Sequence, residues 1–178
     1  MAPAATSASG AFAFCDIAGF TAFTAERGDD AAIDLVARFR SHVADGLPTG
    51  ARIVNRIGDG LLVHFGDPGP AVPALLALTE LCSDAASLDA PLWIRTGVHV
   101  GTARLLGDDL IGHDVNVAAR VGELAGAAEV LVTERTLADA GPEVRFDAVG
   151  PVFVKGVPDA LRVYRASTTE AASPTPAG

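Results

Sequence analysis

Basic side chains are scarce in this chain. Its 178 residues include 13 Lys and Arg but 22 Asp and Glu, so the formal net charge at pH 7 is -9. Nucleic acids and anionic membrane surfaces attract basic proteins, and this charge argues against either as the main partner. An anionic substrate would therefore need local help, from a metal ion or from clustered Arg and Lys side chains.

Cysteines are few, and long apolar runs are lacking. Cys15 and Cys82 fit no metal-binding or redox spacing, and two cysteines alone do not establish a disulfide. No apolar run approaches the roughly 20 residues of a membrane helix, and the start, MAPAATSASG, lacks the basic region of a signal peptide. We therefore expect a cytoplasmic protein with reduced cysteines and no membrane partner.

The signatures of several common enzyme classes are also missing. The chain has no Walker-type loop, no nucleophile elbow and no dinucleotide-binding glycine fingerprint. His42, His64, His99 and His113 do not have the spacing of metal ligands, so we expect each to be a structural or solvated histidine. Any chemistry has to be carried by other residues.

The chain has the length and apolar content of one folded domain. Apolar residues make up 49% of it, enough for a single substantial core. Small and polar residues dominate 1–10, and Ser, Thr and Pro dominate 167–178. We expect both ends to be disordered and one domain to cover 11–166.

Apolar spacing predicts strands that alternate with helices, plus one antiparallel hairpin. Ile33, Val36, Phe39 and Val43 have helical spacing within 31–46. Further helices are expected over 71–86, 113–126 and, more briefly, 134–141. Strands are expected over 11–17, 51–57, 61–65, 92–101, 129–133, 146–157 and 161–166. This order indicates a mixed α/β or an α+β sandwich.

Two aspartates stand where strands end. Asp16 follows the first strand and precedes a turn permitted by Gly19, a suitable place for a metal and a phosphate, although a turn cap would also explain it. Asp59 lies in the Gly-Asp-Gly turn of the predicted hairpin. If the first strand lies beside this hairpin, the two carboxylates meet and repel each other unless cations lie between them. Paired metals are a recurrent arrangement for displacement at phosphorus.

A third candidate group lies on the predicted helix 113–126. Asn116 and Arg120 are four residues apart and share one face, whereas Val117, Val121 and Leu124 form a different, apolar face. Arg120 then projects a charge-assisted donor away from the core. The alternative is an ordinary solvated arginine.

Five motifs together resemble one protein family. FCDIAGFT, NRIGDG, IRTGVHVG, DDLIGHDVNVAAR and VKGVPDALRVYR occur in the order found in class III nucleotidyl cyclase catalytic domains, and the likeness spans about 11–165. The short segment 101–109 is similar to the actinobacterial-type subclass with an abbreviated dimerisation arm. The resemblance implies an α+β, ferredoxin-like βαββαβ-type fold, with a mixed, mainly antiparallel sheet flanked by helices. It also implies a head-to-tail homodimer with shared active sites.

The resemblance assigns one group of residues to metal and phosphate binding. Asp16 and Asp59 match the aspartates that hold two divalent ions, Mg²⁺ or Mn²⁺, and the carbonyl of Ile17 matches a further ligand. Arg95 matches an arginine near the triphosphate on the same protomer. The nucleotide would be a nucleoside triphosphate, with ATP favoured.

A second group would come from the other protomer. Asn116 matches the asparagine that positions the ribose, and Arg120 the arginine that stabilises charge on the α-phosphate. Lys155 matches a lysine on the terminal phosphates. The implied reaction converts ATP to 3′,5′-cyclic AMP and pyrophosphate.

Asn55 departs from the family pattern. This position is usually lysine in adenylyl cyclases and acidic in guanylyl cyclases, whereas Asn55 can both donate and accept hydrogen bonds. Asp109 matches the second base-contacting position with the adenine-type residue, although a one-residue shift would place Asp108 there. We favour ATP with reduced base discrimination. The alternatives are that Asn55 faces away, that the chain is a non-catalytic nucleotide-binding dimerisation module, that it cyclises GTP or a pyrimidine triphosphate, or that it is an unrelated phosphoryl-transfer enzyme.

Overall fold

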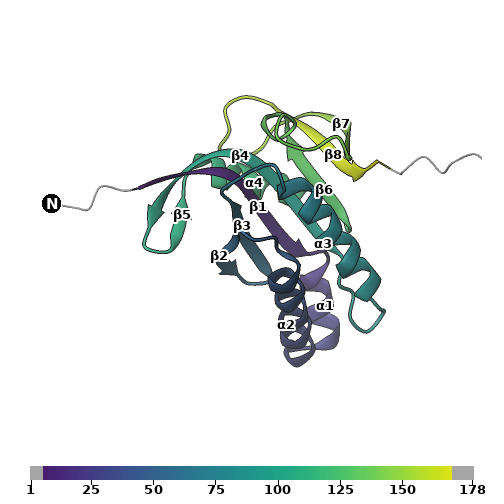
Figure 1. The fold of residues 1–178 in the computed structure, drawn as a ribbon. Coiled ribbons are helices and arrows are strands. Elements are labelled where there is room, and N and C mark those ends of the chain that lie inside the picture. The colour runs from purple at the N-terminus through teal and green to yellow at the C-terminus, as the bar shows by residue number, and fades with distance from the viewer. Residues whose placement is uncertain (1–5, 170–178) are drawn as a thin grey trace, which may run out of the picture.

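One sheet of eight strands, with four α-helices on its two faces, makes up the computed structural model, which describes residues 6–169 (Figure 1). The strands are β1 (Ser7–Ile17), β2 (Ala51–Ile57), β3 (Gly60–Phe65), β4 (Ile94–Leu106), β5 (Asp109–Ile111), β6 (Glu129–Thr133), β7 (Val144–Val152) and β8 (Leu161–Thr168). The helices are α1 (Phe20–Arg27), α2 (Asp29–Gly46), α3 (Ala71–Ala85), α4 (His113–Leu124) and a 3-10 turn, η1 (Glu134–Thr136).

The sheet is mixed and mainly antiparallel. Its strand order is β2-β3-β1-β4-β6-β8-β7, with β5 paired to β4. The β4–β6 pair is parallel and the other pairs are antiparallel. The expected α+β fold is confirmed, and the predicted hairpin 51–65 is present as β2 and β3.

Alternate residues of β1 face opposite sides of the sheet, as the period of a strand requires. Ala11, Ala13, Cys15 and Ile17 belong to the large core that includes side chains of α2 and α3. Phe12 faces the other side, where it packs in a smaller cluster with Ala118 of α4. Because residues 11–15 of β1 face packed side chains on both sides of the sheet, this part of the strand is a continuous apolar run.

The buried face of α2 differs from the predicted one. Ala32, Leu35, Phe39 and Val43 are buried, whereas the side chain of Ile33 is 65% exposed. Phe39 and Val43 were expected to be buried, and that is confirmed. The prediction that Ile33 lies on the buried face is wrong. Ala32 and Leu35 have helical spacing with Phe39 and Val43, and they form the start of the buried face instead.

The ordered part of the chain extends further than its composition indicates. Strand β1 begins at Ser7, and residues 7–10 pair with residues 101–104 of β4, although disorder was expected up to residue 10. Strand β8 continues to Thr168, two residues past the expected end of the domain. Backbone pairing with a neighbouring strand orders these small polar residues. The disorder expected for 1–5 and 170–178 falls outside the described residues.

Within 6–169, no helix has the length and apolar character needed to cross a membrane.

Candidate active site

The end of β1 and the β2–β3 turn lie side by side. Strand β3 pairs with β1 antiparallel, with Cys15 opposite Leu61, so the turn that contains Asp59 lies beside the strand end that contains Asp16. The adjacency on which the two-carboxylate hypothesis depended is therefore confirmed. The two aspartates, 43 residues apart in sequence (59 − 16), belong to one edge of the molecule.

Arg95 forms a two-pronged ion pair with Asp16. The two residues are directly opposite each other on β4 and β1. Arg95 Nε donates to Asp16 Oδ1 at 2.5 Å, and Arg95 Nη2 donates to Oδ2 at 3.0 Å. The bond to Asp16 raises the pKa of Arg95. The structure thus places an arginine and a carboxylate of the predicted site in contact.

Asp59 lies in an environment that disfavours its negative charge. Burial raises the pKa of Asp59, and the nearby negative charge of Asp16 raises it further. Hydrogen bonds from the backbone N–H groups of Asp59 and Ile17 and the positive charge of Arg95 lower this pKa, but they do not cancel the rise. A divalent cation between the two carboxylates would relieve this repulsion. The electrostatics of the pair therefore suit a cation.

The donor set also suits a hard cation. Carboxylates of Asp16 and Asp59 and the carbonyl of Ile17 are oxygen ligands, which Mg²⁺ and Mn²⁺ accept. Residues 6–169 contain no group of three or more His, Cys, Asp and Glu side chains placed to hold a metal. Mg²⁺ is commonly held by one or two carboxylates together with substrate phosphates and water, and a pair of aspartates is compatible with this kind of site.

Arg40 supports this edge of the molecule from α2. Its Nη2 donates to the carbonyl oxygen of Gly58 at 2.9 Å, next to Asp59 in the turn. The contact ties the carboxylate-bearing turn to a packed helix. Sequence reasoning missed Arg40, because an arginine on a helix face carries no sign of which distant carbonyl it contacts.

Asn116, Arg120 and Lys155 line one cavity of about 290 Å³. The helix α4 contributes the first two, and the loop between β7 and β8 contributes Lys155, so the predicted second group is brought together. Arg120 Nη1 donates to both carboxylate oxygens of Glu123, at 2.7 and 2.9 Å. Glu123 was not predicted, although its spacing of three residues from Arg120 is a helix ion-pair signal.

The two base-contacting candidates touch each other. Asn55 Nδ2 donates to Asp109 Oδ2 at 3.2 Å, across from β2 to β5. The backbone N–H of Arg56 donates to Asn55 Oδ1 at 2.7 Å, and that of Leu110 donates to Asp109 Oδ1 at 2.8 Å. Asn55 therefore faces Asp109, and the contact involves Asp109 rather than Asp108.

The two groups remain separate within one chain. The cavity of Asn116, Arg120 and Lys155 has neither Asp16 nor Asp59 in its lining. A larger hollow of about 780 Å³ lies between α3 and β8 and contains none of the predicted residues. Cavity size does not identify the site here. The predicted residues instead form two groups that line no common cavity within 6–169.

A family model, described as the adenylate and guanylate cyclase catalytic domain, matches residues 4–167. An adenylate cyclase of Streptomyces griseus is 33% identical over 120 residues, which are 67% of this chain and 29% of that protein. A pH-sensitive adenylate cyclase of Mycobacterium tuberculosis is 28% identical over 159 residues, 86% of this chain and 39% of that protein. The chain thus spans well under half the length of these relatives.

Solved structures with the same fold include cyclases of both kinds. The adenylyl cyclase CyaB from P. aeruginosa has a TM-score of 0.83 at 23% identity, covering 95% of this chain and 98% of that one. The guanylyl cyclase Cya2 has a TM-score of 0.80 at 17% identity, and the match covers 96% of this chain and 98% of that one. Since both kinds share the fold, it does not discriminate between the two bases.

Proposed function

Because the chain belongs to the adenylate and guanylate cyclase catalytic domain family, we propose that it converts ATP to 3′,5′-cyclic AMP and pyrophosphate. Domains of this family bind nucleoside triphosphates, use divalent metals and work as dimers. The proposal includes a homodimer with two shared sites and a cytoplasmic location, where the free, buried Cys15 and Cys82 stay reduced.

One observation carries the proposal. Each chain holds two complementary half-sites: an acidic edge with Asp16 and Asp59, and a basic cavity with Arg120 and Lys155. The carboxylates of the acidic edge would hold cations that bind the triphosphate. The side chains of the basic cavity would stabilise the negative charge that develops at phosphorus. A head-to-tail dimer would bring the acidic edge of one protomer to the basic cavity of its partner.

The acidic half-site would bind and orient the triphosphate. Asp16, Asp59 and the Ile17 carbonyl would hold two Mg²⁺ or Mn²⁺ ions. When bound, such ions lower the pKa of the 3′-hydroxyl and neutralise the leaving pyrophosphate. Arg95 lies against Asp16, so its guanidinium would then share its donors between this carboxylate and the phosphate oxygens.

The basic half-site would act on the transition state. The 3′-oxygen forms a bond to the α-phosphorus as the bond to pyrophosphate breaks in line, and the hydroxyl proton is released. Arg120 supplies donors where negative charge builds up on the α-phosphate, and Asn116 holds the ribose. Lys155 places a cation near the terminal phosphates. Glu123 accepts two hydrogen bonds from Nη1 of Arg120 on the same helix.

ATP is the favoured nucleotide because Asp109 can accept a hydrogen bond from an exocyclic amino group. Asp109 already accepts from Asn55 and from the Leu110 N–H, and a carboxylate has about four acceptor positions, so capacity remains. Asn55 offers both a donor and an acceptor where a lysine would offer only charge and donors. This residue favours a second candidate, a cyclase that also accepts GTP or a pyrimidine triphosphate.

The test is incubation of the purified protein with ATP, GTP, CTP and UTP separately, first with Mn²⁺ and then with Mg²⁺. Products are identified by mass, and Asp59→Ala is the control. A cyclic product that disappears in the variant supports the proposal, and its base settles which nucleotide is used. Nucleotide binding without any cyclic product at high protein concentration would instead indicate a non-catalytic binding module.

A further inference from the structure

Three alternate residues of β4 face α4. A Cβ atom on Gly97 would lie 2.0 Å from the backbone N of Gly122, and one on Gly101 would lie 2.1 Å from Asp114 Oδ2. The two glycines therefore let α4 approach the strand closely. His99 lies between them with the same side-chain direction, so it is the single large side chain of the segment GVHVG that faces the helix.

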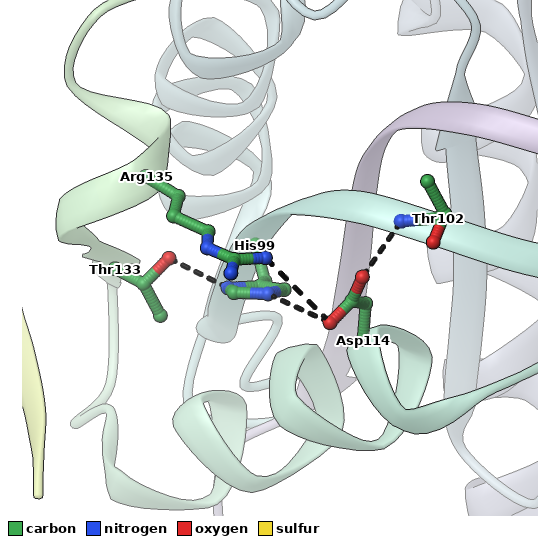
Figure 2. A network of polar contacts seen from close by, with 5 residues as sticks. All are labelled: His99, Thr102, Asp114, Thr133 and Arg135. Carbon is green, nitrogen blue, oxygen red and sulfur yellow. Dashed lines mark hydrogen bonds and ion pairs between the residues drawn. The ribbon is translucent and has the colours of Figure 1, made fainter.

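His99 joins α4 to β6 through a buried polar network (Figure 2). Its Nδ1 is 2.7 Å from Thr133 Oγ1 and its Nε2 is 3.3 Å from Asp114 Oδ1, and His99 is only 4% exposed. The other carboxylate oxygen of Asp114 accepts the backbone N–H of Thr102 at 2.7 Å. Nη1 of Arg135, whose side chain is 68% exposed, lies 4.0 Å from Asp114 Oδ1. One carboxylate thus links the first turn of α4 to two points on β4.

The hydrogen-bond partners of the His99 imidazole indicate which of its nitrogens carries a proton. Asp114 only accepts, so Nε2 of His99 carries the proton and donates to it. In a neutral ring Nδ1 then accepts, and the hydroxyl of Thr133 donates. Burial lowers the pKa of His99, which favours this neutral ring. Both ring nitrogens of His99 therefore have a hydrogen-bond partner.

The helix held in this way carries two residues of the basic half-site. Asn116 and Arg120 follow Asp114 by two and six residues on α4. A rotation or slide of the helix would move both away from the α-phosphate, and α4 has no side-chain cap at its start to resist it. We propose that His99 and Asp114 are positioning residues that fix the rotation and register of α4 and thereby set Asn116 and Arg120 for catalysis. This inference rests on the proposed function.

The test uses Asp114→Ala, with kcat and KM for ATP measured at saturating Mn²⁺. We expect kcat to fall about 10- to 100-fold while KM changes less than about threefold, because displacement of a charge-stabilising group mainly affects the transition state. Asp114→Asn, in contrast, should keep most of the wild-type kcat. The amide can accept from Thr102 and donate to His99, whose ring then takes the other tautomer while the Thr133 hydroxyl accepts.

Mixing variants tells positioning apart from a general loss of stability. In a shared-site dimer, Asp114→Ala damages only the half-site of its own α4. We expect recovery when it is mixed with Asp59→Ala, whose α4 is intact, and no recovery when it is mixed with Arg120→Ala. Val43→Ala, a core change in α2 on the opposite face of the sheet, is the matched control for destabilisation and should show no such partner preference.

Each outcome has one meaning. Wild-type kcat in Asp114→Ala, or equal recovery with both partners, would overturn the positioning role. Failure of Asp59→Ala and Arg120→Ala to complement each other would instead count against the shared-site function itself, so the two failures are distinguishable.

Discussion

Replacing Gly97 with alanine is expected to displace α4 from the sheet. The new Cβ would lie 2.0 Å from Gly122 N, 2.5 Å from Ala118 O and 2.6 Å from Gly122 Cα. All three are backbone atoms of the helix, so no side chain can rotate away. Ordinary contact begins at 3.4 Å, and the helix must therefore move by about 1.4 Å (3.4 − 2.0).

The size of this movement sets the expected effects. A misplacement of about 1 Å at a catalytic group can slow a reaction about 100-fold, and Arg120 moves with the helix. We expect kcat to fall by about that factor. Forcing an extra methyl into a packed contact also costs about 1–3 kcal/mol of the free energy of unfolding.

A matched control lies on the other side of the same contact. A Cβ on Gly122 would lie 3.3 Å from both Gly97 N and Phe14 O, so these atoms of the sheet would have to move by only about 0.1 Å (3.4 − 3.3) to restore ordinary contact. Because alanine is about 1 kcal/mol better than glycine in a helix, Gly122→Ala should match or exceed wild-type stability and keep kcat within about threefold. The assays are steady-state cyclic nucleotide formation and urea unfolding. Wild-type kcat in Gly97→Ala would refute the role assigned to this contact.

Three further predictions follow from single side chains. Asp59→Asn should raise the unfolding temperature of the metal-free protein in a thermal shift assay, because it removes a negative charge that burial and Asp16 disfavour. The same variant should no longer be stabilised by Mn²⁺, and a lower unfolding temperature without metal would contradict the prediction. The pKa of His99 is lower in the folded chain than in the unfolded chain, so below about pH 6.5 the imidazole binds a proton more readily in the unfolded chain. The free energy of unfolding should therefore fall between pH 7.5 and 5.5 more steeply in the wild type than in His99→Gln, and equal slopes would rule this out. Asn55→Lys should raise the ratio of kcat/KM for ATP to that for GTP; an unchanged ratio would show that this position does not select the base beside Asp109.

The strands and the positions of the two aspartates could be predicted because their signals are local, whereas the adjacency of β1 and β3 came only from the folded sheet. Asp16 and Asp59 each stand at a strand end or turn, and pairing of β1 with β3 brings them together. The Asn55–Asp109 hydrogen bond was not predicted, because register across β2 and β5 is a property of the folded sheet. Asn116 and Arg120 could be placed on one helix face from spacing alone.

The supporting contacts lay beyond sequence reasoning. Arg40 contacts a carbonyl 18 residues away, and His99 contacts Asp114 only because two glycines let α4 settle onto β4. His99 was expected to be a structural or solvated histidine, and the structure shows it buried and fully bonded. Such contacts depend on close packing between elements, which residue types and spacing do not specify.

The most direct test of the shared-site cyclase is a mixture of two inactive variants. Asp59→Ala and Arg120→Ala should each be inactive as homodimers. With random exchange of protomers, about half of the dimers are mixed and each keeps one of two sites, so an equimolar mixture should recover about a quarter of wild-type activity in a symmetric dimer. No recovery, with mixed dimers demonstrated by mass, would contradict the account.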